Sequence, residues 1–247
     1  MTGIELRIVS WNCAGGLRKK WQVLDELNAD LLIIQECENP ALAADPAYLA
    51  WAGDYLWTGP TKNKGIGVFA RNGLQVEQQQ LELGALEFFL PCVINGDWPL
   101  LATWTAGASS GTFSYIGQLW RFLQLHKNFV GHPRGMVVGD LNSNVQWDKQ
   151  HRTCSHSDVV QILSDIGLQS AYHRHFKEPQ GKETRATFFH HRKVDKPYHI
   201  DYAFLGAEWL EREVQIGTLD KWLSLSDHVP ISVVVRRVGS NVTQGEA

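Results

Sequence analysis

The stretch MVVGDLNSN, residues 136–144, decides how the rest of the chain is interpreted. Its valines favour a short buried strand, because β-branched side chains suit a pleated interior surface. At the end of that strand Asp140, Asn142 and Asn144 occupy alternate positions, and alternate residues of an extended backbone share one face. Gly, Asp, Asn and Ser are also the common turn residues, so the stretch taken alone favours an ordinary turn. The rest of the sequence has to decide between a turn and a functional group of side chains.

The composition is typical of a globular protein with a large core. The chain has 247 residues, of which 44% are hydrophobic and 20% charged, and its net charge is −3. That acidity argues mildly against a broad nucleic-acid-binding surface, which is usually basic. The four cysteines include no CxxC pair, which disfavours a zinc site or a disulfide framework. With no signal-like segment and no apolar run of membrane-spanning length, we expect a cytoplasmic protein without a membrane partner.

Hydrophobic periodicity predicts more strands than helices. The expected strands are residues 4–11, 31–36, 64–71, 99–106, 136–140, 184–190, 199–206 and 229–237, with a meander over 74–83 and 87–94, and the expected helices are residues 18–28, 115–129 and 157–166. No linker or internal repeat divides the chain. We therefore expect one catalytic domain over residues 1–238, in which two sheets pack face to face with helices outside. The polar segment 239–247 is expected to be a flexible tail.

Other predicted strands also carry polar side chains at or near one end. These residues are Asn12, Glu36, the pair His199 and Asp201, and the pair Asp227 and His228. An unpaired carboxylate in an apolar strand is unfavourable, and two carboxylates about 4 Å apart repel by roughly 4 kcal/mol at an effective dielectric constant of 20. Few lysines or arginines accompany these strands in the sequence. A divalent cation with oxygen ligands, Mg²⁺ or Mn²⁺, is therefore the expected counter-charge.

Five motifs, SWN, QE, GDLNSN, HIDYAF and SDHVPI, occur in this order between residues 10 and 231. In order and spacing they resemble the endonuclease/exonuclease/phosphatase superfamily, and the opening RIVSWNCAGGLRKKW, residues 7–21, looks most like exonuclease III and the apurinic-site endonucleases. The resemblance covers residues 7 to about 235. It implies the DNase I-like fold, an α/β four-layered sandwich of two packed mixed β-sheets flanked by helices. It also implies hydrolysis of a phosphate ester with Mg²⁺ or Mn²⁺.

The resemblance implies metal binding by three residues. Glu36 looks like the principal ligand, Asn12 lies beside it, and Asp227 looks like a second acid at the metal. Many members of the superfamily have an acid two positions after the first-strand Asn, where this chain has Ala14. That difference weakens the expectation of a second metal.

The resemblance implies catalytic roles for four other residues. Asp140 looks like the group that orients or deprotonates the attacking water, and Asn142 like a donor to the phosphate or to that water. Asp201 and His228 look like a carboxylate–imidazole pair that contacts the phosphate. These residue types suit the reaction independently of the resemblance. An imidazolium stabilises charge on the non-bridging oxygens, and a carboxylate base accelerates attack by about 10²–10⁴-fold.

Four further residues are candidate substrate contacts. Trp104 stands where many members of the superfamily have His or Tyr, and its indole either stacks on a base or sugar or packs in the core. Arg192 and Lys193 belong to a short basic stretch that either contacts backbone phosphates or forms a solvated hairpin. His199 shares a predicted strand face with Asp201, and it either touches the site or is a core histidine.

The motifs favour a nuclease that hydrolyses DNA or RNA, so nucleic acid is the expected partner. A phosphatase or phosphodiesterase acting on a small or lipid phosphate, such as a phosphoinositide or sphingomyelin, is the main alternative, and the acidic net charge favours it. A catalytically silent interaction module is the third hypothesis, and the complete set of catalytic residue types argues against it. The sequence leaves open DNA versus RNA and endo- versus exonucleolytic cleavage.

Overall fold

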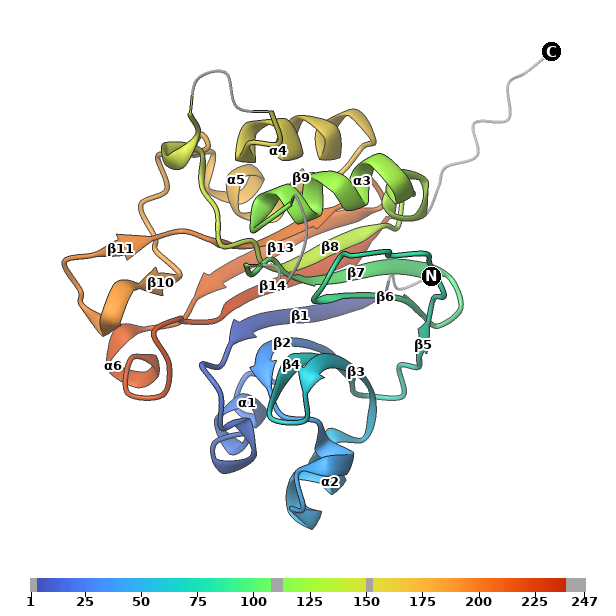
Figure 1. Cartoon of the computed structure of the whole chain (residues 1–247), viewed down its shortest axis with the longest axis vertical. Helices are drawn as coiled ribbons and strands as arrows, with labels where there is room; N and C mark the ends of the chain where they lie inside the picture. The colour runs from blue at the N-terminus through green and yellow to red at the C-terminus, as the bar shows by residue number, and fades with distance from the viewer. Residues whose placement is uncertain (1–3, 108–112, 150–152, 239–247) are drawn as a thin grey trace.

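Two six-stranded sheets form the centre of the computed structural model, which describes residues 4–107, 113–149 and 153–238 (Figure 1). The first sheet contains, in spatial order, β13 (Trp209–Ile216), β14 (Ile231–Arg237), β1 (Glu5–Asn12), β2 (Leu31–Cys37), β4 (Lys64–Ala70) and β3 (Asp54–Thr61). The second contains β5 (Val76–Gln78), β6 (Phe89–Ile94), β7 (Trp98–Trp104), β8 (Met136–Asp140), β12 (Asp201–Leu205) and β9 (Gln169–Ser170). A separate hairpin consists of β10 (Phe188–Phe189) and β11 (Pro197–Tyr198).

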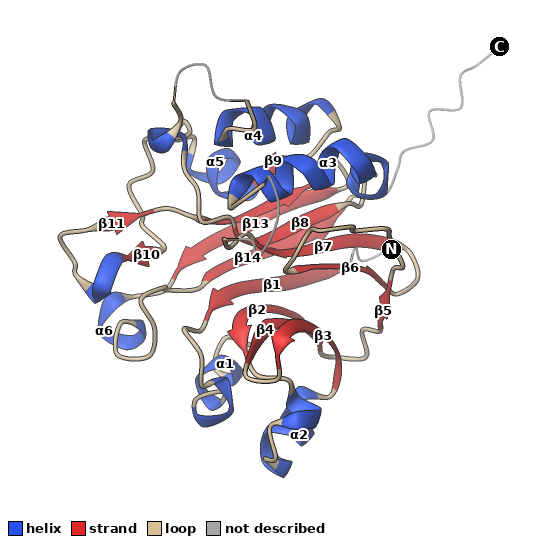
Figure 2. Cartoon of the chain, viewed as in Figure 1, coloured by secondary structure: helices blue, strands red, loops and turns tan. Residues whose placement is uncertain are grey.

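Both sheets are mixed, and helices cover their outer faces (Figure 2). β1 runs parallel to β2 and β7 runs parallel to β8, whereas the other neighbouring strands are antiparallel. The helices α3 (Ile116–Val130) and α4 (His156–Asp165) pack on the second sheet. The short helices α1 (Gln22–Asp25), α2 (Pro46–Ala52) and α6 (Leu219–Trp222) pack on the first sheet, and α5 (Ala171–Phe176) follows β9. This arrangement confirms the predicted four-layered α/β sandwich.

The central strands are buried on both faces. Along β1, Leu6 and Ile8 face the second sheet, whereas Val9 and Trp11 face the helices, as the two-residue period of a strand requires. Burial on both faces also explains the continuous apolar run Leu31–Ile34 of β2. A polar side chain within such a strand has no route to water. Polar residues are therefore expected where these strands end.

Gly139 sets the position of the end of β8. Its φ is +150°, and a Cβ atom at this position would lie 1.8 Å from the backbone oxygen of Thr103 on β7. Only glycine fits so close an approach of two backbones. The next residue, Asp140, is consequently in register with Trp104 on β7 and with Asp201 on β12.

Several predicted elements differ from the observed ones. The predicted helix 18–28 is wrong as one element, because Lys20, with φ −147°, separates a 3₁₀ turn at Leu17–Lys19 from α1. The predicted strand 184–190 is wrong except at β10, since the hydroxyl of Thr187 accepts the N–H groups of Ile200 and Asp201 in place of a regular ladder. The half-exposed edge strands β3 and β13 were not predicted, because their sequences lack clear alternation.

The polar tail predicted at residues 239–247 lies outside the described residues. Over the ranges 4–107, 113–149 and 153–238, no helix has both the length and the apolar character needed to cross a bilayer.

Candidate active site

Six polar residues meet at one end of the two sheets, and we call them the strand-end cluster: Asn12, Glu36, Asp140, Asn142, Asp201 and His228. The first sheet contributes the end of β1 and the end of β2. The second sheet contributes the end of β8 and the beginning of β12, which are adjacent because these strands are antiparallel. The residues predicted to act together are thus brought together from distant parts of the sequence.

Asp140 is the centre of the strand-end cluster. Its side chain is fully buried and accepts hydrogen bonds at Oδ2 from the Asn12 amide, at 3.0 Å, and from the Asn142 amide, at 2.9 Å. Its Oδ1 accepts the backbone N–H of Asn142 at 2.7 Å, a contact that closes the turn after β8. Three donors on two segments therefore fix the orientation of this carboxylate.

His228 and Asp201 form a buried pair beside Asp140. His228 Nδ1 lies 2.9 Å from Asp201 Oδ2, and its Nε2 lies 3.9 Å from Asp140 Oδ2. The ring of Phe188 covers the imidazole with ring centroids 4.7 Å apart, and the Trp11 indole donates to the His228 carbonyl. These contacts hold the ring with one nitrogen on Asp201 and the other directed toward Asp140.

Burial and neighbouring charge shift the pKa of two groups in the strand-end cluster. Burial raises the pKa of the Asp140 carboxyl to about 7, the charge of Asp201 adds to the rise, and the His228 imidazolium opposes it. Burial lowers the pKa of His228, but the carboxylates of Asp201 and Asp140 outweigh burial and raise it to about 9. At neutral pH the site therefore combines an imidazolium with a carboxyl group whose pKa suits proton transfer.

Glu36 reaches the strand-end cluster from a bulge in β2. The register of β2 on β4 shifts between Gln35 and Cys37, and Glu36 itself has φ +61°, an uncommon conformation for a residue with a side chain. The bulge directs the carboxylate toward Asn12, whose amide lies 3.4 Å away. On its other side Glu36 forms an ion pair with Lys64 at 3.0 Å.

The donor set of this site fits a divalent cation. One carboxylate oxygen each from Asp140 and Asp201 and a ring nitrogen of His228 lie within 4.8 Å of one another, the one such group within the described ranges. Because the pKa of His228 is raised to about 9, its ring is protonated at neutral pH, and the two carboxylates are the potential ligands of this group. Asp201 Oδ1 is buried and has no hydrogen-bond partner. An unpartnered buried carboxylate oxygen is unfavourable unless a cation or a donor meets it, and carboxylate oxygens suit hard divalent cations. Glu36 lies outside this group of three and is joined to it through the Asn12 amide.

The other two predicted metal ligands have other contacts. The Asn12 oxygen accepts the N–H of Ala14 at 3.0 Å, and the amide nitrogen points to the carboxylates, an arrangement that suits an orienting role. Asp227 is half-buried and contacts the Ser226 hydroxyl at 3.5 Å. For both residues metal binding stays a prediction.

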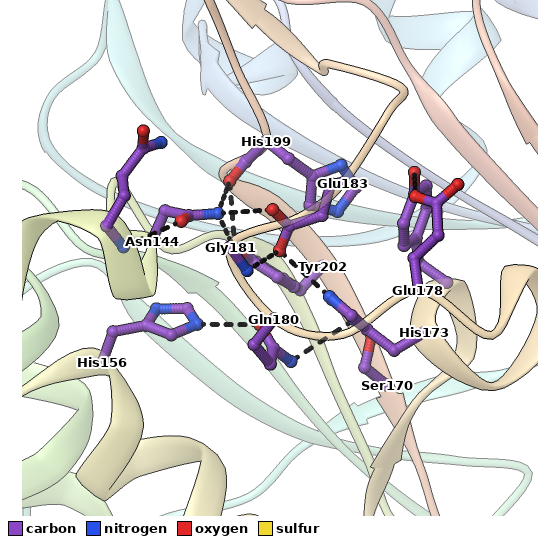
Figure 3. Close-up of polar contacts among 12 residues, drawn as sticks. Asn144, His156, Ser170, His173, Glu178, Gln180, Gly181, Glu183, His199 and Tyr202 are labelled. Carbon is purple, nitrogen blue, oxygen red and sulfur yellow. Dashed lines mark hydrogen bonds and ion pairs between the residues drawn. The ribbon is translucent and has the colours of Figure 1, made fainter.

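A second polar group, which we call the buried histidine cluster, consists of Asn144, His156, His173, Gln180, Glu183, His199 and Tyr202 (Figure 3). It adjoins the strand-end cluster along the chain, since Asn144 follows Asn142 and His199 precedes Asp201 by two residues each. The Glu183 carboxylate accepts hydrogen bonds from His173 at 3.0 Å, from the Gly181 N–H at 2.9 Å and from Asn144 at 3.2 Å. Although burial raises the pKa of Glu183, these bonds outweigh it and lower the pKa to about 2. The Asn144 amide also donates to the His199 carbonyl, which ties the segment after β8 to the segment before β12.

His199 belongs to the buried histidine cluster rather than to the strand-end cluster. Its ring packs on Tyr172 with centroids 4.3 Å apart, and its Nδ1 contacts the Arg185 carbonyl at 2.9 Å. Only 3% of the residue is exposed. Of the two predicted alternatives, these contacts favour a core histidine, and β12 begins only at Asp201, so the two-residue period of the strand does not extend back to His199.

The remaining predicted substrate contacts differ in exposure. Trp104 is 5% exposed and packs on Phe88 with ring centroids 4.6 Å apart, which leaves little of its ring for stacking on a base. Arg192 and Lys193 are exposed, and Arg192 donates to the carbonyl of Ser224, near Asp227. The basic pair is therefore free to contact a ligand, whereas the indole is packed, and substrate binding by all three residues stays a prediction.

Two residues at the site were missed in the sequence. Lys64 pairs with Glu36, but it lies 28 positions further along the chain, in no recognisable motif. Phe188 covers His228 from a hairpin whose sequence reads as an ordinary apolar strand. Contacts of this kind depend on how the hairpins fold over the sheet edge, and neither leaves a local pattern.

Comparison with known proteins places this geometry in context. The sequence profile of the Endonuclease/Exonuclease/phosphatase family matches residues 9–228. A search of curated proteins finds no significant match.

Three solved structures share the fold at low sequence identity. The 3′ phosphatase NExo from Neisseria, bound to a product DNA hairpin, has a TM-score of 0.69 and 16% identity, and the alignment covers 92% of this chain and 98% of that one. For the 3′–5′ exonuclease NExo from Neisseria meningitidis the values are 0.66 and 18%, with coverage of 92% and 98%. For an AP endonuclease from Archaeoglobus fulgidus they are 0.64 and 18%, with coverage of 93% and 99%.

Proposed function

Because the chain belongs to the endonuclease/exonuclease/phosphatase family, we propose that it is a divalent-metal-dependent phosphodiesterase that cleaves DNA or RNA. The observation that carries the proposal is the setting of Asp140, which is held by two amides and faces the His228–Asp201 pair. Burying two carboxylates next to each other is unfavourable for stability alone. A catalytic role explains this arrangement better than a silent interaction module does.

Each residue of the strand-end cluster then has a defined task. Asp140, with a pKa near neutrality, takes the proton of the attacking water, and Asn12 and Asn142 hold its carboxylate in place. As the water oxygen bonds to phosphorus, the ester P–O bond breaks, and the leaving oxygen takes its proton from solvent. His228 is kept protonated and oriented by Asp201, so its Nε2–H donates to a non-bridging phosphate oxygen. Glu36, with the free oxygen of Asp201, would hold Mg²⁺ or Mn²⁺, and the cation supplies charge neutralisation of the phosphate.

Aromatic rings beside His228 support a nucleic-acid substrate. Phe188 lies on His228, Tyr198 lies 6.2 Å from Phe188, and Trp147 lies 5.0 Å from Tyr198, all measured between ring centroids. Trp147 is 43% exposed. Bases stack on such surfaces with little sequence preference. The names of the structural neighbours, a 3′ phosphatase bound to DNA, an exonuclease and an AP endonuclease, make DNA the first substrate to test.

A phosphatase or phosphodiesterase on a small or lipid phosphate is the second candidate. The net charge of −3 favours it, because long nucleic acids are usually bound by basic surfaces. The chemistry at Asp140 and His228 would be the same, and only the substrate contacts would differ.

Hydrolysis assays separate these functions. The protein is incubated with labelled single- and double-stranded DNA and RNA, an abasic-site duplex, a 3′-phosphorylated oligonucleotide, a phosphoinositide and sphingomyelin, each with Mg²⁺, Mn²⁺ or EDTA. We expect metal-dependent cleavage of an oligonucleotide that EDTA abolishes. A preference for the small or lipid phosphate would favour the second candidate, and no metal-dependent hydrolysis of any substrate would contradict both.

A further inference from the structure

Lys64 is the cation in contact with Glu36. Its Nζ lies 3.0 Å from Glu36 Oε2 and also 5.2 Å from the centroid of the Trp104 ring. The lysine side chain is 49% exposed, whereas the Glu36 side chain is 22% exposed. The ammonium can therefore leave the carboxylate for water, and the cation–π contact with Trp104 gives it a second partner at the edge of the site.

The β3–β4 hairpin fixes Lys64 in this place. Gly65, next to Lys64, has no room for a side chain, since a Cβ there would lie 2.3 Å from the Thr58 oxygen, and Gly59 meets the Lys64 oxygen in the same way at 2.5 Å. The backbones of the two paired strands therefore approach each other closely at Gly59 and Gly65. Because β2 bulges at Glu36 and resumes pairing at Cys37 opposite Gly65, the glutamate and the lysine are brought side by side.

The carboxylate of Glu36 thus has two partners of different kinds. Asn12 is 3% exposed and is held by Asp140 and Ala14, so its amide is a fixed neutral donor. Lys64 is a half-exposed positive charge at the end of a flexible side chain. A divalent cation that approaches Glu36 Oε2 meets the ammonium at the same oxygen, and two positive charges at that distance repel.

We propose that Lys64 is a built-in competitor of the divalent cation for Glu36. The ammonium neutralises the carboxylate until the metal binds, and metal binding releases it toward solvent and the Trp104 ring. This inference rests on the proposed function in one respect, which is that Glu36 holds the metal. Its consequence is a weaker affinity for the metal than the same carboxylates would have without the lysine.

Amine labelling reports the release of Lys64 directly. The folded protein is treated briefly with an amine-acylating reagent, and the modification of each lysine is quantified by mass spectrometry in EDTA and in saturating Mg²⁺. We expect Lys64 to be labelled at least twofold faster with Mg²⁺, because the ion pair with Glu36 slows the reaction in EDTA. Lys62 lies on the same hairpin, is exposed and serves as the internal control, with unchanged labelling. In Glu36→Gln, Lys64 should react at the fast rate with and without Mg²⁺.

Metal titration tests the competition itself. Lys64→Met should bind Mn²⁺ roughly threefold to tenfold more tightly than the wild type by calorimetry, the range expected when one half-exposed charge is removed from a site. Lys64→Arg keeps the charge and should restore the wild-type affinity, and Lys62→Met should leave it unchanged.

The outcomes distinguish this inference from the proposed function. Unchanged affinity in Lys64→Met, while Glu36→Gln loses metal binding, overturns the competition and leaves the function standing. A wild type that binds neither Mg²⁺ nor Mn²⁺ overturns both. Equal labelling of Lys64 in wild type and Glu36→Gln in EDTA overturns the ion pair, whatever the metal does.

Discussion

The strand-end cluster and the buried histidine cluster lie next to each other and differ in how far their charges are satisfied. In the buried histidine cluster, Glu183 receives three hydrogen bonds, one of them at its second oxygen. In the strand-end cluster, Asp201 keeps an unpartnered buried oxygen, and the charged partner of Glu36 is a half-exposed lysine. Satisfied polar networks stabilise one fold, whereas unsatisfied ones are typical of sites that bind a ligand. In the buried histidine cluster the ring nitrogens His156 Nδ1 and His199 Nε2 also lack partners, so the comparison concerns the carboxylates. We expect Glu183 to contribute to stability and the carboxylates of the strand-end cluster to contribute to chemistry.

Asp140→Asn should greatly lower the cleavage rate and leave the folded structure intact. The amide preserves the size of the side chain but cannot take the proton of water, so we expect a loss of cleavage rate of about 10²–10⁴-fold. Single-turnover cleavage at saturating Mg²⁺ measures the rate, and thermal unfolding followed by circular dichroism measures the fold. A variant that cleaves within a few-fold of wild type would remove Asp140 from the reaction.

Glu183→Gln should lower the stability of the fold and leave the cleavage rate nearly unchanged. It removes the charge that receives hydrogen bonds from His173 and Asn144 in a side chain that is 4% exposed. Hydrogen bonds to a charged group contribute about 1.5–3 kcal/mol, so we expect the free energy of unfolding to fall by roughly that amount. Urea unfolding measures this free energy. Glu26→Gln, at an exposed ion pair with Lys221, is the matched control and should change stability by less than about 1 kcal/mol. If Glu183→Gln instead lowered the cleavage rate more than tenfold at full stability, the division between the clusters would be wrong.

Lowering the pH tests the same comparison, because it destabilises the folded protein through His199 and stabilises it through Asp140. Burial lowers the pKa of His199 from 6.5 to about 4, so its contribution is full above pH 6.5 and is lost as the pH falls toward 4. Burial raises the pKa of Asp140 to about 7, which favours the folded state as the pH falls from 7. His199→Gln should therefore lose less stability than wild type between pH 7.5 and 4.5, by on the order of 1 kcal/mol.

Urea unfolding at the two pH values measures this difference, and the exposed His175→Gln serves as control. Equal losses in His199→Gln and wild type would show that the His199 ring is not buried in its neutral form. The result is independent of any metal, since His199 lies outside the strand-end cluster.

The architecture and much of the site follow from local signals in the sequence. Continuous apolar runs such as residues 31–34 predict doubly buried strands, and a polar residue at the end of such a strand has few places to lie. For this reason a group that included Asn12, Glu36, Asp140, Asp201, Asp227 and His228 was predicted at the strand ends. All of these except Asp227 are found in contact with one another. The edge strands β3 and β13 were missed because one side of each is exposed and its sequence is less constrained.

The parts that could not be predicted depend on hairpins and on strand starts. Lys64 reaches Glu36 because β2 bulges at Glu36 and because the backbones of β3 and β4 approach closely at Gly65. Neither feature produces a periodic pattern in the sequence. The sequence left open whether His199 touches the site or is a core histidine, because a shift of one or two residues in the start of β12 decides which way its ring points. Burial of Trp104 likewise depends on Phe88, which follows a segment without regular structure.

Removing the basic pair Arg192 and Lys193 should have the smallest effect, and it tests whether these residues contact the substrate. Arg192 and Lys193 are exposed, and Arg192 lies against the segment that leads to Asp227. If they contact phosphates that flank the scissile one, the double variant Arg192→Gln, Lys193→Gln should weaken oligonucleotide binding and reduce the log–log salt slope by roughly 1–2. Fluorescence anisotropy in Ca²⁺ between 50 and 200 mM salt, about the range over which phosphate contacts are resolved, measures both quantities.

The control for that experiment neutralises two exposed charges elsewhere, Lys127 on α3 and Arg212 on β13. It changes the net charge equally, so a long-range effect of charge alone would reduce the slope in both variants. A reduced slope in the Arg192, Lys193 variant alone would place flanking phosphates on this hairpin. An unchanged slope there, with cleavage of the oligonucleotide intact, would mean that the strand-end cluster and the rings beside it hold the substrate without the basic pair, as expected for an enzyme that acts at a strand terminus or on a small phosphate ester.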